Sequence, residues 1–316
     1  MYRILTQYNI TTKPASDNLE FHFYPSDTLK NKLRFCCLAV FTNRFDGVLV
    51  EGTRIATLIC FFRLFFPRQV KVFVNSPFLD YPPTGFIDRL KFRIVDSSIF
   101  RYLVVGSSEI EAYKKFWGVK SKKLFHHPFK VNSAELLDSL SCSQGSFIHA
   151  GGDSLRDYPT LFLAIKGTGI PTEVFTTLKF EKSIVPEEVV LLRRSKDERE
   201  FYQSMADAFV CVFPTEAGHL RVGAQSCYLC AMYLKKVVIV SAGPGVDDFI
   251  KDGYNGFIVP PGDPKALQEK IMFVKNNYES LAPMRAAAYE TVRDHTHDNY
   301  MQRMFRYIEQ ELKNEI

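Results

Sequence analysis

Short apolar runs alternate with segments of helical periodicity along the first half of the chain. Runs rich in β-branched and aromatic residues predict strands at 3–8, 19–23, 47–50, 70–74 and 102–105. Between them, apolar residues recur at helical spacing over 29–41, 53–66, 86–100 and 109–117. Strands that alternate with helices predict a parallel sheet covered by helices.

The second half repeats this order after a polar stretch. Strands are predicted at 147–150, 172–176, 189–192, 208–213 and 237–240, with helices at 158–166, 197–205, 225–234 and 264–276. From residue 278 onward the pattern is helical and ends in a charged amphipathic tail. We therefore predict two doubly wound, Rossmann-like α/β domains that face a cleft: 1–132, a linker at 133–146, and 147–298. A C-terminal helix at 299–316 is expected to pack back toward the first domain.

Composition supports this organisation. The 316 residues are 46% hydrophobic and 24% charged, which is typical of a globular chain long enough for two domains and excludes disorder. The net charge of +5 is uneven, because residues 1–146 hold 20 Lys and Arg against 12 Asp and Glu, whereas residues 147–316 hold 20 against 23. A basic first half is compatible with nucleic acid, anionic lipid or a phosphorylated substrate, and the charge alone does not choose among them.

The seven cysteines and the N-terminus indicate a cytoplasmic protein. Most of the cysteines lie among apolar residues, which favours buried, reduced thiols, and the C-x-x-C pair of Cys227 and Cys230 lacks a second pair for zinc. The N-terminus has no apolar segment typical of secretion. The apolar stretch 55–67 contains Arg63 and is too short to span a bilayer.

One segment is more specific than the pattern around it. Residues 237–240 form an apolar run, a Gly-Pro-Gly loop follows at 243–245, and residues 252–267 read DGYNGFIVPPGDPKAL. This order resembles the C-terminal domain of GT-B fold glycosyltransferases, in particular the retaining family 4. Weaker similarity extends over the rest of the chain, at 45–50, 102–108, 119–130 and 149–161.

The resemblance implies a site for a nucleotide-sugar donor, whose diphosphate needs backbone N–H groups and cations. Gly151 and Gly152 allow close approach of the backbone, and Arg156 stands where the family has a phosphate-binding Lys. Without the resemblance, a simple strand-to-helix turn with a solvated arginine explains the same residues.

The family also carries two glutamates near the donor. Glu216, in the segment FPTEAGH, matches the first, which lies beside the sugar. At the second position this chain has Cys230, fourteen residues later, and a thiol cannot accept two ribose hydroxyls as a carboxylate does. Gln225 or Ser226 is the candidate for the missing polar contact, and His219 is the candidate histidine for the cleft.

On the acceptor side the family often has a histidine after the strand at 70–74, where this chain has Asn75 and Ser76. His126 and His127 near the linker favour structural roles. Basic clusters at 89–93 and 120–123 are read as solvated faces, since they accompany no nucleic-acid-binding module. An anionic membrane that carries a lipid-linked acceptor remains open, because the aromatic run 61–66 lies beside Arg68.

The resemblance thus implies a cytoplasmic hexosyltransferase that moves a sugar from a UDP- or GDP-linked donor to a glycan or lipid-linked acceptor. Peripheral association with the inner face of a membrane is the alternative to a freely diffusing protein. The resemblance also implies retention of configuration, no metal and no cofactor. The alternative is a non-catalytic partner that kept the fold. The expected catalytic residues are Glu216 and His219, and the expected donor-binding residues are Gly151, Gly152, Arg156, Gly218, Gln225, Ser226, Gly243, Gly245 and Val246. Asn75 and Ser76 are expected on the acceptor side.

Overall fold

A computed structural model describes all residues except 66–69, 196 and 315–316. The chain divides into two compact units, which are treated separately. Unit 1 comprises residues 1–128 together with 298–316, and unit 2 comprises 129–297. Unit 1 holds 22 Lys and Arg against 14 Asp and Glu, so the excess positive charge inferred from the sequence belongs to this unit.

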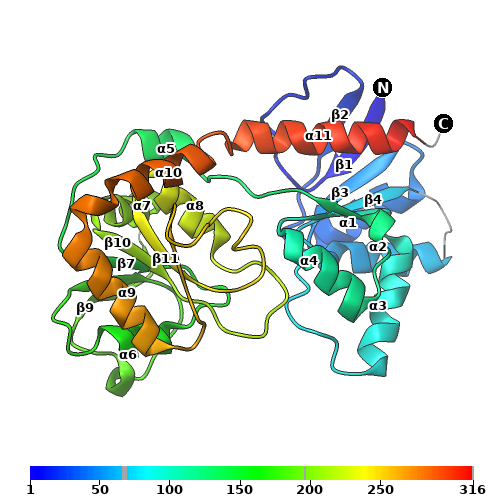
Figure 1. Cartoon of the computed structure of the whole chain (residues 1–316). Helices are drawn as coiled ribbons and strands as arrows, with labels where there is room; N and C mark the ends of the chain where they lie inside the picture. The colour runs from blue at the N-terminus through cyan, green and yellow to red at the C-terminus, as the bar shows by residue number, and fades with distance from the viewer. Residues whose placement is uncertain (66–69, 196, 315–316) are drawn as a thin grey trace. The chain divides into compact units, whose positions relative to one another are not determined.

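Unit 1 is built on a six-stranded sheet in which every described strand pair is parallel (Figure 1). The strand order is β2-β1-β3-β4-β5-β6. The strands are β1 (Tyr2–Thr6), β2 (Leu19–Phe23), β3 (Gly47–Glu51), β4 (Lys71–Asn75), β5 (Arg101–Val104) and β6 (Leu124–His126). Their near-continuous apolar runs are explained by helices on both faces of the sheet.

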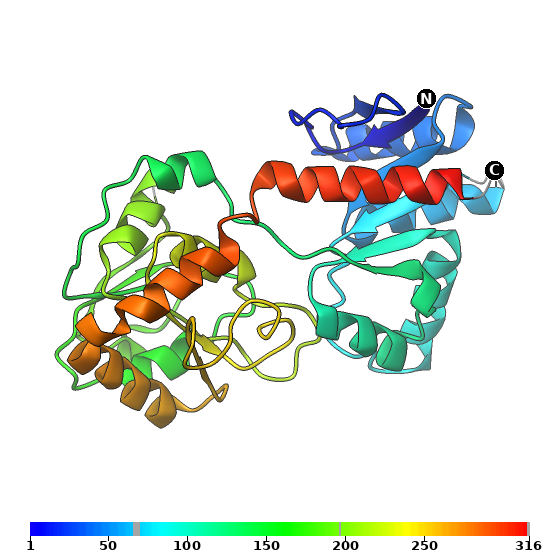
Figure 2. The same ribbon diagram turned by 45° about the horizontal axis from the view of Figure 1, so that its top comes forward.

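The helices of unit 1 include one from the far end of the sequence. The N-terminal part supplies α1 (Leu29–Phe41), α2 (Thr53–Phe65), α3 (Phe86–Ser98), α4 (Ser107–Ala112), a π-helical turn (Tyr113–Trp117) and a 3-10 turn (Ser121–Lys123). The C-terminal helix α11 (His297–Lys313) runs along this sheet (Figure 2). Its Phe305 contacts Phe21 of β2 with ring centroids 4.7 Å apart, and Asn18 donates to Glu309 at 2.8 Å. The expected return of the C-terminal helix to the first domain is confirmed.

Unit 2 contains a second parallel six-stranded sheet in the order β12-β11-β10-β7-β8-β9. Its strands are β7 (Ile148–Gly151), β8 (Thr172–Phe175), β9 (Val189–Arg193), β10 (Val210–Phe213), β11 (Val237–Ser241) and β12 (Phe257–Val259). Strands β8 and β9 are added on one side of β7, and β10, β11 and β12 are added on its other side. The crevice beyond the carboxyl ends of β7 and β10 is therefore the switch point at which open α/β sheets bind ligands.

Helices cover both faces of the second sheet, and two apolar clusters fill the layers between. The helical segments are α5 (Ala134–Asp138), α6 (Tyr158–Ile165), α7 (Glu198–Asp207), α8 (Gln225–Tyr233), α9 (Pro264–Asn277), α10 (Ala282–Val292) and 3-10 turns at Lys182–Ile184 and Glu279–Leu281. Asp157, Asp197 and Asp263 cap α6, α7 and α9 by accepting backbone N–H groups three residues ahead.

The predicted α/β fold class with two Rossmann-like domains is confirmed, although several boundaries differ. The chain leaves unit 1 after Pro128, and the segment expected as a linker, 133–146, includes α5, which packs against α8 within unit 2. Strand β6 and helix α5 were not predicted. The end of the aromatic run, with Phe66 and Arg68, lies outside the described residues. None of the described helices is both long and apolar enough to cross a membrane.

Candidate active site

Two loops meet at the switch point of unit 2. The loop after β7 and the loop after β10 pair through a bridge between Arg156 and Thr215. The Glu216 N–H donates to the Leu155 carbonyl at 3.1 Å, and the Asp157 N–H donates to the Pro214 carbonyl at 3.1 Å. Residues 151–156 and 214–219, which the sequence assigned to one donor site, are therefore joined at one edge of the sheet.

The two glycines after β7 are required by close packing. An added Cβ at Gly151 would lie 2.4 Å from the Phe201 ring. Gly152 has φ +101°, and a Cβ there would lie 2.5 Å from Arg156 Nη2. Any side chain at these positions would therefore disturb the loop, in which the Gly152 N–H donates to the Phe175 carbonyl at 2.9 Å and the Gly152 carbonyl accepts the Tyr158 hydroxyl at 2.6 Å.

Arg156 is buried beneath this loop. Its Nε donates to the Gly151 carbonyl and its Nη1 to the Ser154 carbonyl, both at 2.9 Å, and its Nη2 donates to Cys227 Sγ at 3.4 Å. The guanidinium therefore holds the loop in shape and brings a positive charge under the switch point. Its contact with a phosphate stays a prediction.

An open cavity of about 660 Å³ adjoins the glycine loop. Its walls are Gly152, Asp153, Phe175, Thr176, Thr177, Arg194, Ser195, Asp197, Glu198 and Phe201. Asp153 accepts hydrogen bonds from both threonine hydroxyls and from the Thr177 N–H, each at 2.7 Å. Partial burial acts to raise the pKa of Asp153, but these bonds outweigh it and hold the pKa below its usual value. The cavity wall thus includes the Asp153 carboxylate, which is held in place by hydrogen bonds, and the rings of Phe175 and Phe201.

Most residues of this wall are not among the site residues predicted from the sequence. The signal that could have found it is the position of Thr176 and Thr177 directly after β8, since ligands of parallel sheets lie at the carboxyl ends of strands.

Behind the cavity wall, His149 of β7 lies fully buried between aromatic rings. Its Nδ1 is 2.9 Å from Ser204 Oγ, which donates to Glu173 at 2.6 Å. Burial lowers the pKa of His149 to about 3, so its ring is neutral. His149 contacts the wall residues Phe175 and Phe201 and belongs to the support of the site.

Helix α8 begins at the same edge with an unpaired amide. Ala224 precedes it with φ +61°, and the Gln225 side chain is 5% exposed with neither amide atom hydrogen-bonded to a described residue. The first turn of α8 carries no acidic side chain and no side-chain cap. A helix start with free N–H groups attracts anions. This arrangement is suited to phosphate oxygens that would also pair with the Gln225 amide.

His219 and the loop after β11 lie beside this helix start. His219 is buried, and its Nδ1 is 2.6 Å from the Arg221 carbonyl. A Cβ on Gly243 would lie 3.5 Å from the His219 ring, so His219 contacts the Gly243 loop. Glu216 and Gly218 are exposed on the loop after β10, Ser226 is half-buried, and Val246 is buried in the core with the turn that contains Gly245. Their roles stay predictions.

Cys230 does not lie at this edge. Its Sγ faces the Asn132 carbonyl at 3.6 Å and the Tyr202 hydroxyl at 3.9 Å, and burial raises the pKa of the thiol to about 12. The position that carries a glutamate in the resembled family therefore holds a neutral core thiol.

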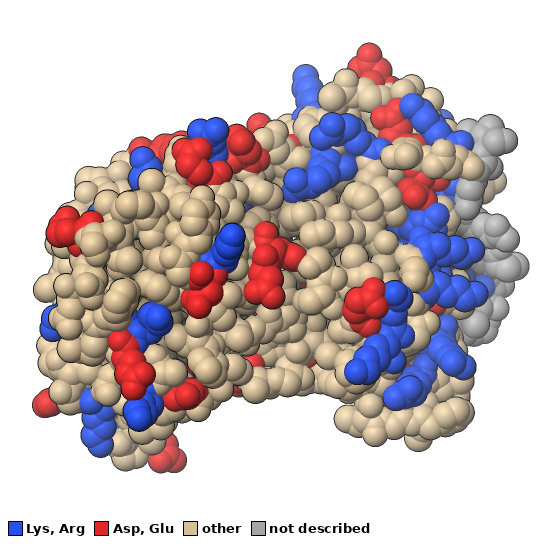
Figure 3. Space-filling view, viewed as in Figure 1, with Lys and Arg blue, Asp and Glu red and all other residues tan. Residues whose placement is uncertain are grey.

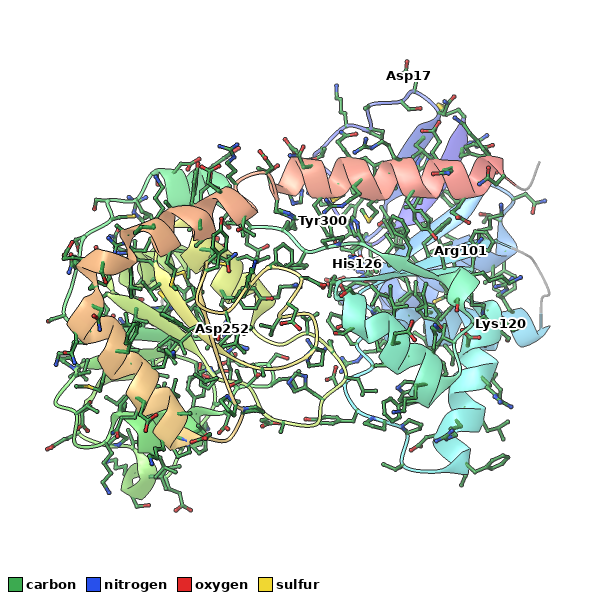
Figure 4. The ribbon with its side chains drawn as sticks, in the orientation of Figure 1. Asp17, Arg101, Lys120, His126, Asp252 and Tyr300 are labelled. Atoms are coloured by element: carbon green, nitrogen blue, oxygen red, sulfur yellow. The ribbon has the colours of Figure 1, made fainter. Side chains whose placement is uncertain are left out.

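The segment 252–267 acts as a scaffold (Figure 4 labels Asp252). The buried Asn255 amide donates to the Phe249 carbonyl at 2.9 Å and to Thr291 at 3.0 Å, and its oxygen accepts the Lys251 N–H at 2.8 Å. Asp252 accepts the Ile258 N–H at 2.9 Å. These bonds fix the end of the loop that starts at Gly243.

In unit 1, the expected acceptor residues lie at the carboxyl end of β4. Asn75 and Ser76 are buried. The Asn75 amide donates to the hydroxyls of Tyr300 at 2.9 Å and Tyr8 at 3.2 Å. Burial raises the pKa of both tyrosines, so their hydroxyls stay protonated. Tyr300 comes from α11 (Figure 4), which makes the C-terminal helix part of this edge.

His127 completes the cluster around Tyr300. The two rings lie 4.0 Å apart at their centroids, and Arg303 Nε donates to His127 Nδ1 at 3.4 Å. Burial, aided by the charges of Arg303 and His126, lowers the pKa of His127 to about 3. A neutral, buried histidine agrees with the structural role expected for it.

No group of three His, Cys, Asp or Glu side chains that could hold a metal ion occurs in the part of the chain that the structure describes. The positive groups near the glycine loop of unit 2 include the buried Arg156, Arg194 in the cavity wall and the start of α8. Arg221 also reaches this loop, where its Nη2 donates to Ser154 at 2.7 Å.

Comparison with known proteins finds a family model that matches part of the chain. Residues 146–291 match the family model "Glycosyl transferases group 1". The matched residues lie within unit 2 and make up a little under half of the chain. The curated relative "Capsular polysaccharide biosynthesis glycosyltransferase CapM" of Staphylococcus aureus is 34% identical over 125 residues. That match covers 37% of this chain and 31% of the relative, so the chain spans about a third of its length.

Solved structures extend the likeness to the whole fold. A glycosyltransferase from Rickettsia africae matches with TM-score 0.69 and 14% identity over 98% of both chains. Anabaena Alr3699/HepE in complex with UDP matches with TM-score 0.69 and 12% identity over 98% of this chain and 99% of that one. At these identities the likeness concerns the fold, which is the predicted GT-B fold of two parallel-sheet domains.

Proposed function

We propose that this protein is a hexosyltransferase that moves a sugar from a nucleoside diphosphate sugar, UDP- or GDP-linked, to a glycan or lipid-linked acceptor. The observation that carries the proposal is the edge of unit 2, where an open cavity adjoins the glycine loop and Arg156 connects that loop to the first turn of α8, which has no side-chain cap. The UDP complex of Anabaena Alr3699/HepE, which shares the fold, supports a nucleotide donor.

In this proposal the cavity takes the nucleoside between Phe175, Phe201 and the threonines after β8. The diphosphate then lies over Gly151 and Gly152 and meets the start of α8. As the bond from the sugar to phosphate breaks, negative charge grows on the leaving diphosphate. The free N–H groups of α8, the Gln225 amide and the nearby charge of Arg156 stabilise that charge without a metal ion.

The sugar would extend toward the loop after β10. There Glu216 accepts sugar hydroxyls, and His219 with the Gly243 loop limits the space around the ring. The acceptor would bind to unit 1 near Asn75 and Ser76. We propose retention of configuration, in which the acceptor attacks on the face that the diphosphate leaves.

A donor screen tests this proposal. Release of nucleoside diphosphate is measured over a panel of UDP- and GDP-sugars, with and without glycan and lipid-linked acceptors, in the presence and absence of EDTA. We expect one donor to turn over in EDTA. Glu216→Gln should then lower turnover by about 100-fold, a loss typical of removing a group that acts in the transition state. Glu269→Gln, on the exposed face of α9, is the matched control.

The buried thiol at Cys230 favours a second candidate, a nucleotide-binding partner without transferase activity. Binding of UDP or GDP with no turnover of any donor would support that candidate. Equal turnover by the wild-type protein and Glu216→Gln would instead show that Glu216 is misassigned.

A further inference from the structure

Helix α3 of unit 1 carries its apolar residues on the solvent side. Phe86 is 77% exposed, Ile87 65%, and Leu90 and Ile94 are each 47% exposed. At about 100° per residue these four side chains fall within one arc of about 100°. They form a continuous stripe, which we call the α3 stripe.

The opposite face of α3 is the one that packs. Phe92 is buried and contacts Trp117, with ring centroids 4.8 Å apart. A helix on the surface of a water-soluble domain normally turns its apolar arc inward. Here the apolar arc points away from the unit, and contiguous exposed apolar surface of this kind marks an interaction site.

Basic side chains border the α3 stripe on both sides. Helical spacing places Lys91 next to one margin, and Arg93 and Arg89 next to the other. All three side chains are exposed, and of these Lys91 lies near enough to Asp88 on the same helix to help lower the pKa of that carboxyl. Figure 3 shows Lys and Arg gathered on this part of unit 1, above an uncharged lobe where α3 begins.

The acidic residues of the same helix are already engaged. Asp96 pairs with Lys123 at 3.0 Å and accepts the Tyr102 hydroxyl at 2.9 Å. Asp88 accepts the Thr84 hydroxyl and N–H at the start of the helix. The free charge beside the α3 stripe is therefore positive.

Helix α3 belongs to the connection that follows the expected acceptor residues. It links the parallel strands β4 and β5 and begins after the segment 76–85, which leaves the edge where β4 ends. Its most exposed residues, Phe86 and Ile87, are at its first turn. Asn75 and Ser76 lie at the edge where β4 ends.

We propose that α3 docks unit 1 on an anionic lipid bilayer. Phe86, Ile87, Leu90 and Ile94 enter the boundary between headgroups and acyl chains, while Arg89, Lys91 and Arg93 contact lipid phosphates. A second copy of the chain fits this surface less well, because its own α3 would oppose cations with cations. The inference goes beyond the proposed transfer activity, since it assigns a membrane surface whether or not a donor is turned over.

Vesicle co-sedimentation tests the proposal on the full chain without donor or acceptor. Wild-type protein should bind vesicles that contain phosphatidylglycerol, bind pure phosphatidylcholine more weakly, and dissociate as salt rises. The double variant Phe86→Ser with Ile87→Ser should lower the vesicle partition coefficient more than tenfold. Arg89→Gln and Arg93→Gln should each lower it about fivefold, as expected for one cation near an anionic surface.

Leu163→Ser and Phe273→Ser are matched controls, because these side chains are 62% and 45% exposed on helices of unit 2. Both should bind vesicles as the wild type does, and circular dichroism confirms that each variant is folded. Absence of wild-type binding to anionic vesicles would overturn the proposal, as would an equal loss in the controls. A dimer in light scattering that Phe86→Ser dissociates, without vesicle binding, would assign the α3 stripe to a second copy. Donor turnover is measured separately, so either proposal can fail alone.

Discussion

Replacement of Gly152 by Ala tests whether the loop after β7 is held as closely as the structure indicates. Gly152 has φ +101°, where residues with a side chain are strained by about 1–3 kcal/mol. The new Cβ would also lie 2.5 Å from Arg156 Nη2. That guanidinium is fixed by the Gly151 and Ser154 carbonyls, so its displacement adds about 1–3 kcal/mol.

We therefore expect Gly152→Ala to lower the free energy of unfolding of unit 2 by about 2–6 kcal/mol. For a unit of this size, each kcal/mol lowers the melting temperature by about 2–4 °C. The measurement is differential scanning calorimetry or urea denaturation followed by circular dichroism. Under conditions where the variant is folded, its affinity for the bound nucleoside diphosphate should fall at least tenfold, because Arg156 and the loop shift together.

The matched control is Gly253→Ala. Gly253 also has a positive φ, +73°, but no atom lies within 4 Å of its added Cβ. This variant should lose about 1 kcal/mol from backbone strain alone and keep its nucleotide affinity. Equal destabilisation by the two substitutions would refute the close contact between Gly152 and Arg156. Unchanged nucleotide affinity in folded Gly152→Ala would refute the assignment of this loop to the donor.

Three further changes test the supporting contacts. Tyr300→Phe removes the hydroxyl that is hydrogen-bonded to Asn75, so it should lower the free energy of unfolding of unit 1 in urea by about 1–2 kcal/mol. Tyr254→Phe, at an exposed position, is the control and should have no effect. Identical urea unfolding curves for the two variants would contradict the contact. Burial lowers the pKa of His149 to about 3 in the folded protein, whereas in the unfolded chain the histidine is protonated below about pH 6.5. The free energy of unfolding should therefore fall as the pH drops below about 6.5, by up to about 1.4 kcal/mol per pH unit. His149→Gln should lessen that slope, and an unchanged slope would contradict a neutral buried ring. Asn255→Ala removes three hydrogen bonds and should lower the free energy of unfolding by about 2–4 kcal/mol in thermal unfolding. Asn277→Ala, which removes one exposed hydrogen bond, should lower it by less than about 1 kcal/mol. Similar losses in the two variants would argue against a scaffold role for Asn255.

Most of the fold could be predicted because each buried strand is an apolar run with a clear end. The run at 70–74 ends at Asn75, and the run at 237–240 ends before a Gly-Pro-Gly loop, so turn chemistry marked both boundaries. Strand β6 and helix α5 were missed because three to five residues are too short to show a period.

The candidate site was only partly predictable. Gly151, Arg156 and Glu216 follow from motifs within two loops, and the topology joins those loops. The Asn75 to Tyr300 hydrogen bond links residues 225 positions apart, and no local pattern indicates it. In the same way, the α3 stripe shows ordinary amphipathic spacing in the sequence, and only the structure shows which face is exposed.

Isothermal titration calorimetry of the wild-type protein with UDP, GDP and their sugar conjugates measures whether unit 2 binds a nucleotide-sugar donor. We expect one-to-one binding of one nucleoside diphosphate in EDTA, with a dissociation constant in the micromolar range typical of enzyme substrates. We also expect Gly152→Ala to weaken this binding and Gly253→Ala to leave it unchanged. Absence of binding by every nucleoside diphosphate at millimolar concentration would contradict the assignment of unit 2 to a donor.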